Sequence, residues 1–232
     1  MYAHSVHAFS EKVAFVSDGA SPIGRAVALQ LALLGGYVIV GASAHGAVDE
    51  LISLGTLAKA VSADVTTSAG AAAAVSEIEA SFGRLDLLVN CLKNMPESSF
   101  EDSGDAEFDA VVGSNFKSSY MLTRACLSLM NGRPKPRIVN VVTRAESPNA
   151  PLFRASQAAV EEFTRALAGT LPAKFRVNAV AIRTTGNNRA GFDAELFPMA
   201  SAPSADDAAR AVLFLLSPEA VGVNGQVIEV DS

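Results

Sequence analysis

The sequence predicts a single α/β domain built on a doubly wound parallel sheet, and three observations lead to this fold. Seven short apolar runs alternate with helical patterns along the whole chain, which is typical of parallel strands with helices on both faces. Half of the 232 residues are hydrophobic and only 18% are charged, so one well-buried core can form. No linker, repeat or charge block divides residues 1–232, which we therefore treat as one domain.

The expected strands are short runs rich in aliphatic and β-branched residues. They cover residues 13–17, 37–41, 57–61, 85–91, 137–142, 176–182 and 226–230. The expected helices cover residues 23–34, 47–54, 68–82, 105–130, 151–171 and 205–216. Right-handed crossovers place the strands in the Rossmann-like order 3-2-1-4-5-6-7, with a ligand crevice at the carboxyl ends of the first and fourth strands.

Composition argues against several classes of partner. A formal charge of −6 and basic residues scattered along the sequence predict neither nucleic-acid nor membrane binding. No apolar run has the length of a membrane span, and the first ten residues lack the order of a signal peptide, so we expect a cytoplasmic protein. Cys91 and Cys126 lie in apolar or helical patterns and are expected to be free, buried thiols. His4, His7 and His45 lie apart from other metal ligands, which predicts no metal site.

The first strand, turn and helix read V16-S-D-G-A-S-P-I-G-R-A. This stretch resembles, without a change in length, the V-T-G-x-x-x-G-I-G-R-A motif of the short-chain dehydrogenase/reductase family. In that family the glycines let the backbone approach a pyrophosphate at the helix N-terminus. Ile23 and Gly24 match the motif, but Asp18 and Pro22 replace its first two glycines. An Asp adds negative charge and a Pro removes an N–H, so the stretch fits a plain helix start at least as well as a nucleotide site.

The catalytic segment of the same family is also recognisable, with its reactive groups replaced. The fifth strand reads RIVNVVT to Thr143 and the next helix begins PLFRASQ, which resembles the family's catalytic Ser followed by Y-x-x-x-K. Thr143 stands at the Ser position, Phe153 at the Tyr position and Gln157 at the Lys position. The resemblance implies that the Tyr would donate a proton and the Lys would lower its pKa. Asn115 matches the family's helix Asn, which holds a relay water through a helix irregularity.

Further positions bear on the cofactor. After the second strand the chain reads GASAHG, without the acidic residue that binds an NAD ribose. If a dinucleotide binds, NADP is therefore favoured, with Ser43 or His45 near its phosphate; the altered turn equally allows that no nucleotide binds. Asp64 and Val65 match the family's adenine-contacting pair, and Asp64 fits equally well as a simple N-cap.

The far side of the crevice departs from the family as well. Asn90 is kept in LLVNCLKN, which is similar to the family's D-L-L-V-N-N-A-G, but Lys93 brings bulk and charge. Arg183 stands where the family's A-P-G turn has Gly. We expect Asp18 and Lys93 to pair across the pyrophosphate position, or Lys93 to turn to solvent. Arg183 and Arg144 are expected to make the other end of the cleft weakly cationic.

The resemblance spans residues 13–231 and is closest to simple members such as the 3-oxoacyl-carrier-protein reductases. It predicts a homologue that has lost reductase activity and acts as a non-catalytic subunit or small-ligand binder. The alternative is an NADP-dependent carbonyl or 3-oxoacyl reductase that uses a different acid, such as Thr143 or Lys93.

The resemblance also predicts an oligomer. In the family, the helices that match residues 105–130 and 151–171 pair with their symmetry mates. Phe108, Val112, Tyr120 and Phe163 offer apolar surface on these helices, so we expect a homodimer or homotetramer. A mixed oligomer with an active paralogue is the alternative.

Overall fold

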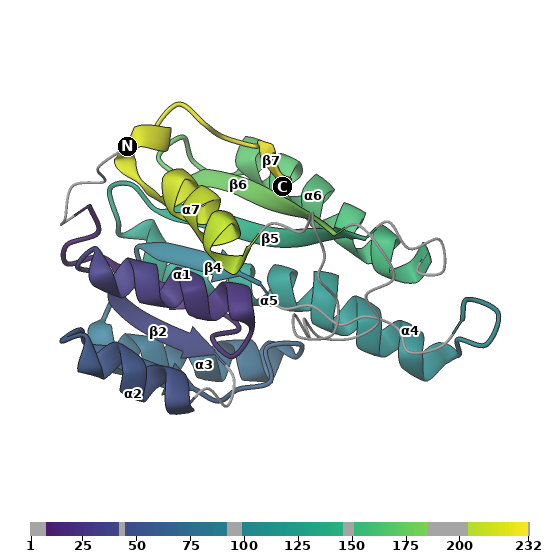
Figure 1. The fold of residues 1–232 in the computed structure, drawn as a ribbon, viewed down its shortest axis with the longest axis horizontal. Coiled ribbons are helices and arrows are strands. Elements are labelled where there is room, and N and C mark those ends of the chain that lie inside the picture. Colours follow the sequence, from purple (N-terminus) through teal and green to yellow (C-terminus); the bar gives the residue numbers. More distant parts are fainter. Residues whose placement is uncertain (1–7, 42–44, 92–98, 146–150, 185–203, 232) are drawn as a thin grey trace.

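The computed structural model describes residues 8–41, 45–91, 99–145, 151–184 and 204–231 (Figure 1). Seven parallel strands form one sheet in the order β3-β2-β1-β4-β5-β6-β7, which confirms the predicted topology. The strands are β1 (Val13–Val16), β2 (Tyr37–Gly41), β3 (Ala58–Val61), β4 (Leu87–Asn90), β5 (Arg137–Ala145), β6 (Arg176–Thr184) and β7 (Val227–Val230).

The helices cover both faces of the sheet, as expected (Figure 1). One face carries α1 (Pro22–Leu33), α2 (His45–Ser53) and α7 (Ala205–Leu216). The other carries α3 (Ser68–Phe82), α5 (Ser118–Asn131) and α6 (Pro151–Thr170). Before α5 the chain forms α4 (Asp105–Val112) and the π-helix η1 (Gly113–Lys117), and a short 3₁₀ turn η2 (Pro218–Ala220) precedes β7. No helix in the described part of the chain is long and apolar enough to cross a membrane.

The strand β1 shows why the central strands read as unbroken apolar runs. All four of its residues are buried, and they alternate between the two faces. Ala14 and Val16 pack with α1 and α7, whereas Val13 and Phe15 pack with α3 and α5. A central parallel strand is covered on both sides, so both sets of side chains are hydrophobic.

Two strands and one helix near the site differ from the sequence-based expectation. β5 and β6 run past their expected ends because their parallel pairing continues through Thr143 with Ile182 and Arg144 with Arg183. The single helix expected at 105–130 is interrupted by η1, whose buried residue is Asn115. This π turn is the helix irregularity that the resemblance implied.

Candidate active site and cofactor crevice

Phe153 lies completely buried in the first turn of α6, at the position of the expected proton donor. Its backbone carbonyl accepts a hydrogen bond from the Ser156 hydroxyl at 2.7 Å. The Ser156 Oγ in turn accepts one from Nδ2 of Asn115 at 2.9 Å. The buried polar groups around the phenyl ring therefore satisfy one another, and the ring itself has no proton to give.

Gln157 and Thr143 meet on the neighbouring side of α6. Oε1 of Gln157 accepts a hydrogen bond from the Thr143 backbone N–H at 2.8 Å, and both residues are buried. An ammonium group has no acceptor and could not replace this contact. The structure thus links Asn115 to Phe153 through Ser156 and links Thr143 to Gln157. The Thr143 hydroxyl is a weak acid near neutral pH.

The turn between β1 and α1 is closed by its own side chains. Oδ1 of Asp18 accepts hydrogen bonds from the backbone N–H groups of Ala20 and Ser21, both at 3.2 Å. The Ser21 hydroxyl donates to the Asp18 carbonyl at 3.0 Å and accepts the Gly24 N–H at 3.1 Å. Ser21 is thereby the N-cap of α1, and Pro22 is its first residue. Ser21 is not among the expected site residues, although a Ser directly before a Pro is a recognised helix start.

These contacts decide whether a dinucleotide fits the turn. A pyrophosphate at a helix N-terminus needs backbone N–H groups that are free to bind it. Here Gly19 N–H donates to the Gly41 carbonyl, and the N–H groups of Ala20, Ser21 and Gly24 are used inside the turn. Among the described residues of the turn, Ile23 is left as the one helix-start amide without an acceptor, because Pro22 has no N–H. The residues present do not fit the pyrophosphate of a nicotinamide dinucleotide.

Asn90 has a structural environment at the end of β4. Its Nδ2 donates to Oδ1 of Asn140 at 2.8 Å and to the Thr123 hydroxyl at 3.0 Å. Asn140 then donates to the Thr164 hydroxyl at 2.8 Å. This buried chain of hydrogen bonds ties β4 and β5 to α5 and α6, so Asn90 can persist without any cofactor.

Cys91 follows Asn90 and lies against the first turn. Its Sγ is 3.6 Å from the Asp18 carbonyl oxygen, and its N–H donates to the Ser17 hydroxyl at 3.0 Å. Burial raises the pKa of the Cys91 thiol to about 12, and the neighbouring Asp18 carboxylate acts in the same direction. Both Cys91 and Cys126 are free, buried thiols, as the sequence predicted.

Asp64 fixes the turn before α3 rather than capping that helix directly. Its Oδ1 accepts the N–H of Thr66 at 3.0 Å and the Thr66 hydroxyl at 2.6 Å, and the latter contact is the main cause of its lowered pKa. The N-cap of α3 is Thr67, so the interpretation of Asp64 as the N-cap is wrong. Val65 is a core residue packed with the α3 and α5 layer.

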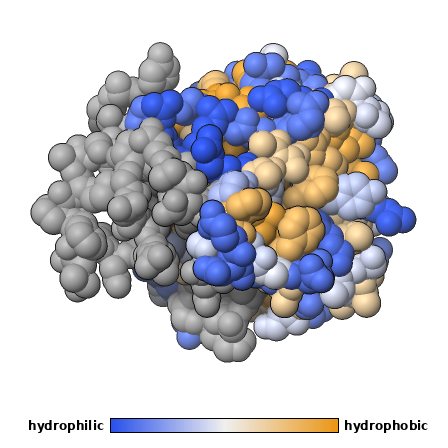
Figure 2. Space-filling view, turned by 90° about the vertical axis from the view of Figure 1, so that its right-hand side faces the viewer, coloured by the Kyte–Doolittle hydropathy of each residue, from blue (hydrophilic) through white to orange (hydrophobic). Residues whose placement is uncertain are grey.

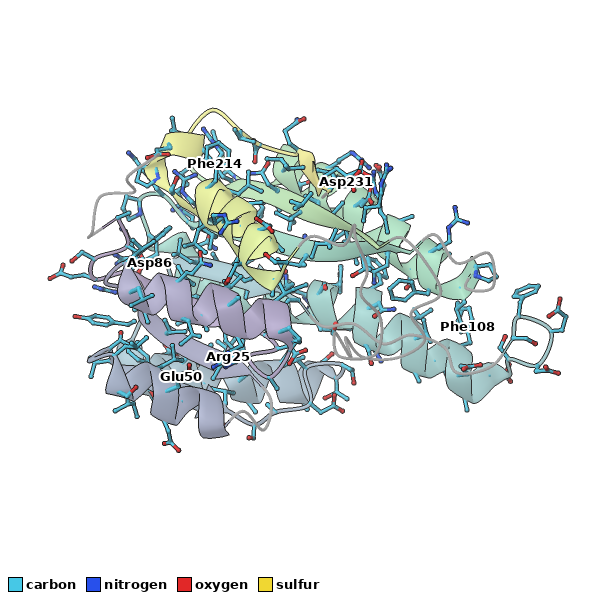
Figure 3. The ribbon with its side chains drawn as sticks, viewed as in Figure 1. Arg25, Glu50, Asp86, Phe108, Phe214 and Asp231 are labelled. Carbon is cyan, nitrogen blue, oxygen red and sulfur yellow. The ribbon has the colours of Figure 1, made fainter. Side chains whose placement is uncertain are left out.

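The expectation of a weakly cationic cleft end is wrong, because acidic residues neutralise both arginines. Arg144 makes two hydrogen bonds to the Glu161 carboxylate, each at 3.0 Å, and one to Glu229 at 2.8 Å. Arg183 pairs with Glu229 at 2.7 Å and with Asp231 at 3.7 Å. The register of β5, β6 and β7 brings these groups to one edge, where Figure 3 shows Asp231. The acidic partners lie on α6, on β7 and directly after β7, far along the sequence, so the family motif alone does not predict them.

Three predicted contributors lie beyond what the structure describes. Ser43 and Lys93 are outside the described residues, and so is the side chain of His45. The Asp18–Lys93 pair and the NADP phosphate contacts therefore stay predictions. Within the described ranges, no group of three or more His, Cys, Asp or Glu residues could hold a metal ion.

In sequence and in fold, the chain is similar to known dehydrogenases and reductases. Residues 19–232 match the family model described as enoyl-(acyl carrier protein) reductase. The chain is 28% identical to the 3-oxoacyl-[acyl-carrier-protein] reductase FabG of Escherichia coli, covering 96% of this chain and 97% of that protein. It is 31% identical to a cyclopentanol dehydrogenase of Comamonas sp., covering 96% of both. A dehydrogenase/reductase structure from Sinorhizobium meliloti matches with a TM-score of 0.86 and 28% identity, covering 97% of this chain and 95% of that one.

Proposed function

Because the chain belongs to the short-chain dehydrogenase/reductase family, we propose that it is a member without the family's proton-transfer chemistry, acting as a non-catalytic subunit or small-ligand binder. The observation that carries the proposal is Phe153, which is fully buried where the resemblance places the proton donor. A general acid is typically worth about 10²–10⁴ in rate. No rotation of a phenyl ring can supply that proton.

The neighbours of Phe153 support the same conclusion. The Ser156 hydroxyl donates to the Phe153 carbonyl, and the Gln157 carboxamide oxygen accepts the Thr143 backbone N–H. Asn115, in the π turn, donates to Ser156 of α6. These side chains make hydrogen bonds within the fold, and none of the contacts requires a substrate.

A second candidate is a carbonyl or 3-oxoacyl reductase that uses a different acid. The relatives favour it, since their names describe a 3-oxoacyl reductase and a cyclopentanol dehydrogenase. Thr143 and Lys93 are the residues that would have to serve. A Lys needs a lowered pKa to act as an acid at neutral pH, and that requires burial or a nearby cation.

A hydride-transfer assay separates the two candidates. The unmodified protein is mixed with NADH or NADPH and a panel of ketones and 3-oxoacyl thioesters, and nucleotide oxidation is followed by absorbance. Loss of the family chemistry predicts no turnover, while the Escherichia coli reductase must turn over in the same mixture as a control. Turnover above the buffer rate that disappears in Thr143→Val would establish the second candidate.

The same assay on Phe153→Tyr with Gln157→Lys tests how much else is missing. These two changes return the donor and its tuning charge but leave the β1–α1 turn unaltered. Proximity and orientation are the larger requirement for hydride transfer, so we expect the double variant to stay inactive. Appreciable NADPH oxidation by it would mean that the crevice accepts the cofactor after all.

We also propose that the protein assembles as a homodimer or homotetramer through α4, α5 and α6. Phe108 on α4 is 53% exposed and Tyr120 on α5 is 41% exposed. The rings of Phe116, Tyr120 and Phe163 contact one another, with centroids 5.6–6.4 Å apart. Figure 2 shows hydrophobic residues gathered on this end of the molecule beside hydrophilic ones, and Figure 3 shows Phe108 on α4. Such an aromatic surface is typical of a protein interface, and a mixed oligomer with an active paralogue would use it equally.

A further inference from the structure

The turns that follow β1 and β3 share one sequence pattern, although β2 separates these two strands in the sheet. The β1–α1 turn reads D18-G-A-S-P-I-G, and the β3–α3 turn reads D64-V-T-T-S-A-G. Both follow the pattern D-x-x-[ST]-x-x-G, with the Ser or Thr as N-cap of the following helix. β1 is a central strand and β3 is an edge strand, so the two turns serve different places in the fold.

Three hydrogen bonds are the same in the two turns, whereas the Ser21 N–H donates to the Asp18 carboxylate and the matching Thr67 N–H donates to the Asp64 carbonyl. The Asp Oδ1 accepts the N–H two residues on, at 3.2 Å in the first turn and 3.0 Å in the second. The Ser21 and Thr67 hydroxyls donate to the Asp carbonyls at 3.0 Å in both turns. The same hydroxyls accept the N–H of Gly24 at 3.1 Å and of Gly70 at 3.0 Å.

The final glycine has the same reason in both turns. A Cβ added to Gly24 would lie 1.7 Å from the Asp18 carbonyl oxygen, and one added to Gly70 would lie 1.9 Å from that of Asp64. The glycine therefore allows the helix start to pack on the Asp carbonyl. Gly24 matches the family's nucleotide motif, but the backbone contact alone accounts for it.

The neighbourhood of the first turn offers little to an anion. Pro22 at the first position of α1 has no N–H, whereas Ser68 occupies that position in α3. Arg25, directly after Gly24, pairs with Glu50 of α2 at 2.6 Å, so its charge is already matched (Figure 3). The Asp18 carboxylate adds a negative charge at the same place.

We infer that the β1–α1 turn is a self-capped turn of the same kind as the β3–α3 turn, in which the Asp18 carboxylate takes the amides that a dinucleotide phosphate would need. The amides of Gly19, Ala20, Ser21 and Gly24 are paired without a ligand, which leaves only that of Ile23, and neither NADH nor NADPH binds there. This goes beyond the missing proton donor, because a protein with Phe153 and Gln157 could still bind a nucleotide.

Titration calorimetry with NADH and NADPH tests the inference directly. We expect no detectable binding by the unmodified protein. The double variant Asp18→Gly with Pro22→Gly should bind at least tenfold more tightly than the weakest binding that the measurement detects. Asp64→Gly is the matched control and should gain nothing. Asp18→Asn keeps the oxygen acceptor without the charge, so it should also gain nothing. Micromolar binding by the unmodified protein, no gain in the folded double variant, or a gain in Asp18→Asn equal to that of the double variant would each overturn the inference.

Thermal unfolding without nucleotide gives a second readout that does not depend on the double variant. If the two turns are equivalent, Asp18→Ala and Asp64→Ala should lower Tm by similar amounts, because each removes the acceptor that holds its turn. An unchanged or raised Tm for Asp18→Ala, beside a lowered Tm for Asp64→Ala, would show that Asp18 does not hold its turn and would overturn the inference. All these variants retain Phe153, so their nucleotide binding and their Tm test the turn whatever the reductase assay shows.

Discussion

The Gln157 carboxamide oxygen accepts the backbone N–H of Thr143 at 2.8 Å, inside a region where both residues are buried. This contact joins the first turns of α6 to β5 near the end of that strand. It makes Gln157 a structural residue at the position where the family resemblance places a Lys.

Restoring Lys at this position should therefore cost stability. Gln157→Lys leaves the Thr143 N–H buried without an acceptor, which costs about 1–3 kcal/mol in free energy of unfolding. Urea denaturation measures the loss. Gln226→Lys makes the same substitution at an exposed site and should change stability by less than about 0.5 kcal/mol. Equal stability of the two variants would contradict the structural role of Gln157.

How far the sequence predicts this molecule depends on the range of the interaction concerned. The strand order follows from local apolar patterns and crossover handedness, and Phe153 and Gln157 follow from a local motif. The partners of Arg144 do not, because Glu161 and Glu229 approach it only after α6 and β7 have packed. Asp18 was recognised as out of place, but its carboxylate turns inward to its own backbone, a choice that depends on turn geometry rather than residue type.

The two buried thiols predict a loss of stability at alkaline pH. Burial raises the pKa of Cys91 and of Cys126 to about 12 from 9.0, so the folded state favours the protonated thiol. Their contribution is complete below pH 9 and declines as the pH rises from 9 towards 12. At about pH 10 each thiol should cost about 1.4 kcal/mol relative to neutral pH.

Denaturant unfolding at neutral and alkaline pH checks this dependence. The variant Cys91→Ala with Cys126→Ala should lose stability less steeply above pH 9 than the unmodified protein, whatever its stability at neutral pH. Identical slopes for the two proteins would mean that the thiols ionise as readily in the folded state as in the unfolded one.

The ion pairs at the ends of β5 to β7 should contribute modestly and respond to salt. Arg144→Ala removes two hydrogen bonds to Glu161, but the Arg side chain is 41% exposed, so we expect a loss of about 1 kcal/mol or less. The loss should shrink in high salt as the charges are screened. Arg210→Ala, which breaks the more exposed pair with Asp207, is the control and should have almost no effect. A larger effect at Arg210 would refute the ranking of the two sites.

The proposed interface can be tested by adding charge to it. Phe108→Lys with Tyr120→Lys should yield a smaller species by light scattering, because both side chains are exposed in the single chain and the proposed assembly would bury them. Leu57→Lys, at a site 61% exposed just before β3, should leave the molecular mass unchanged. A monomeric unmodified protein at micromolar concentration would rule out the proposed homo-oligomer.

The self-capped start of α1 also affects whether the stability of this chain depends on the nucleotide concentration in the cell. A protein that binds a nucleotide only when folded gains stability as the nucleotide concentration rises, by mass action. A turn whose amides donate hydrogen bonds to Asp18 and Ser21 gains no stability from the nucleotide. The folded fraction of this chain would then be independent of the nicotinamide pool and of its redox state.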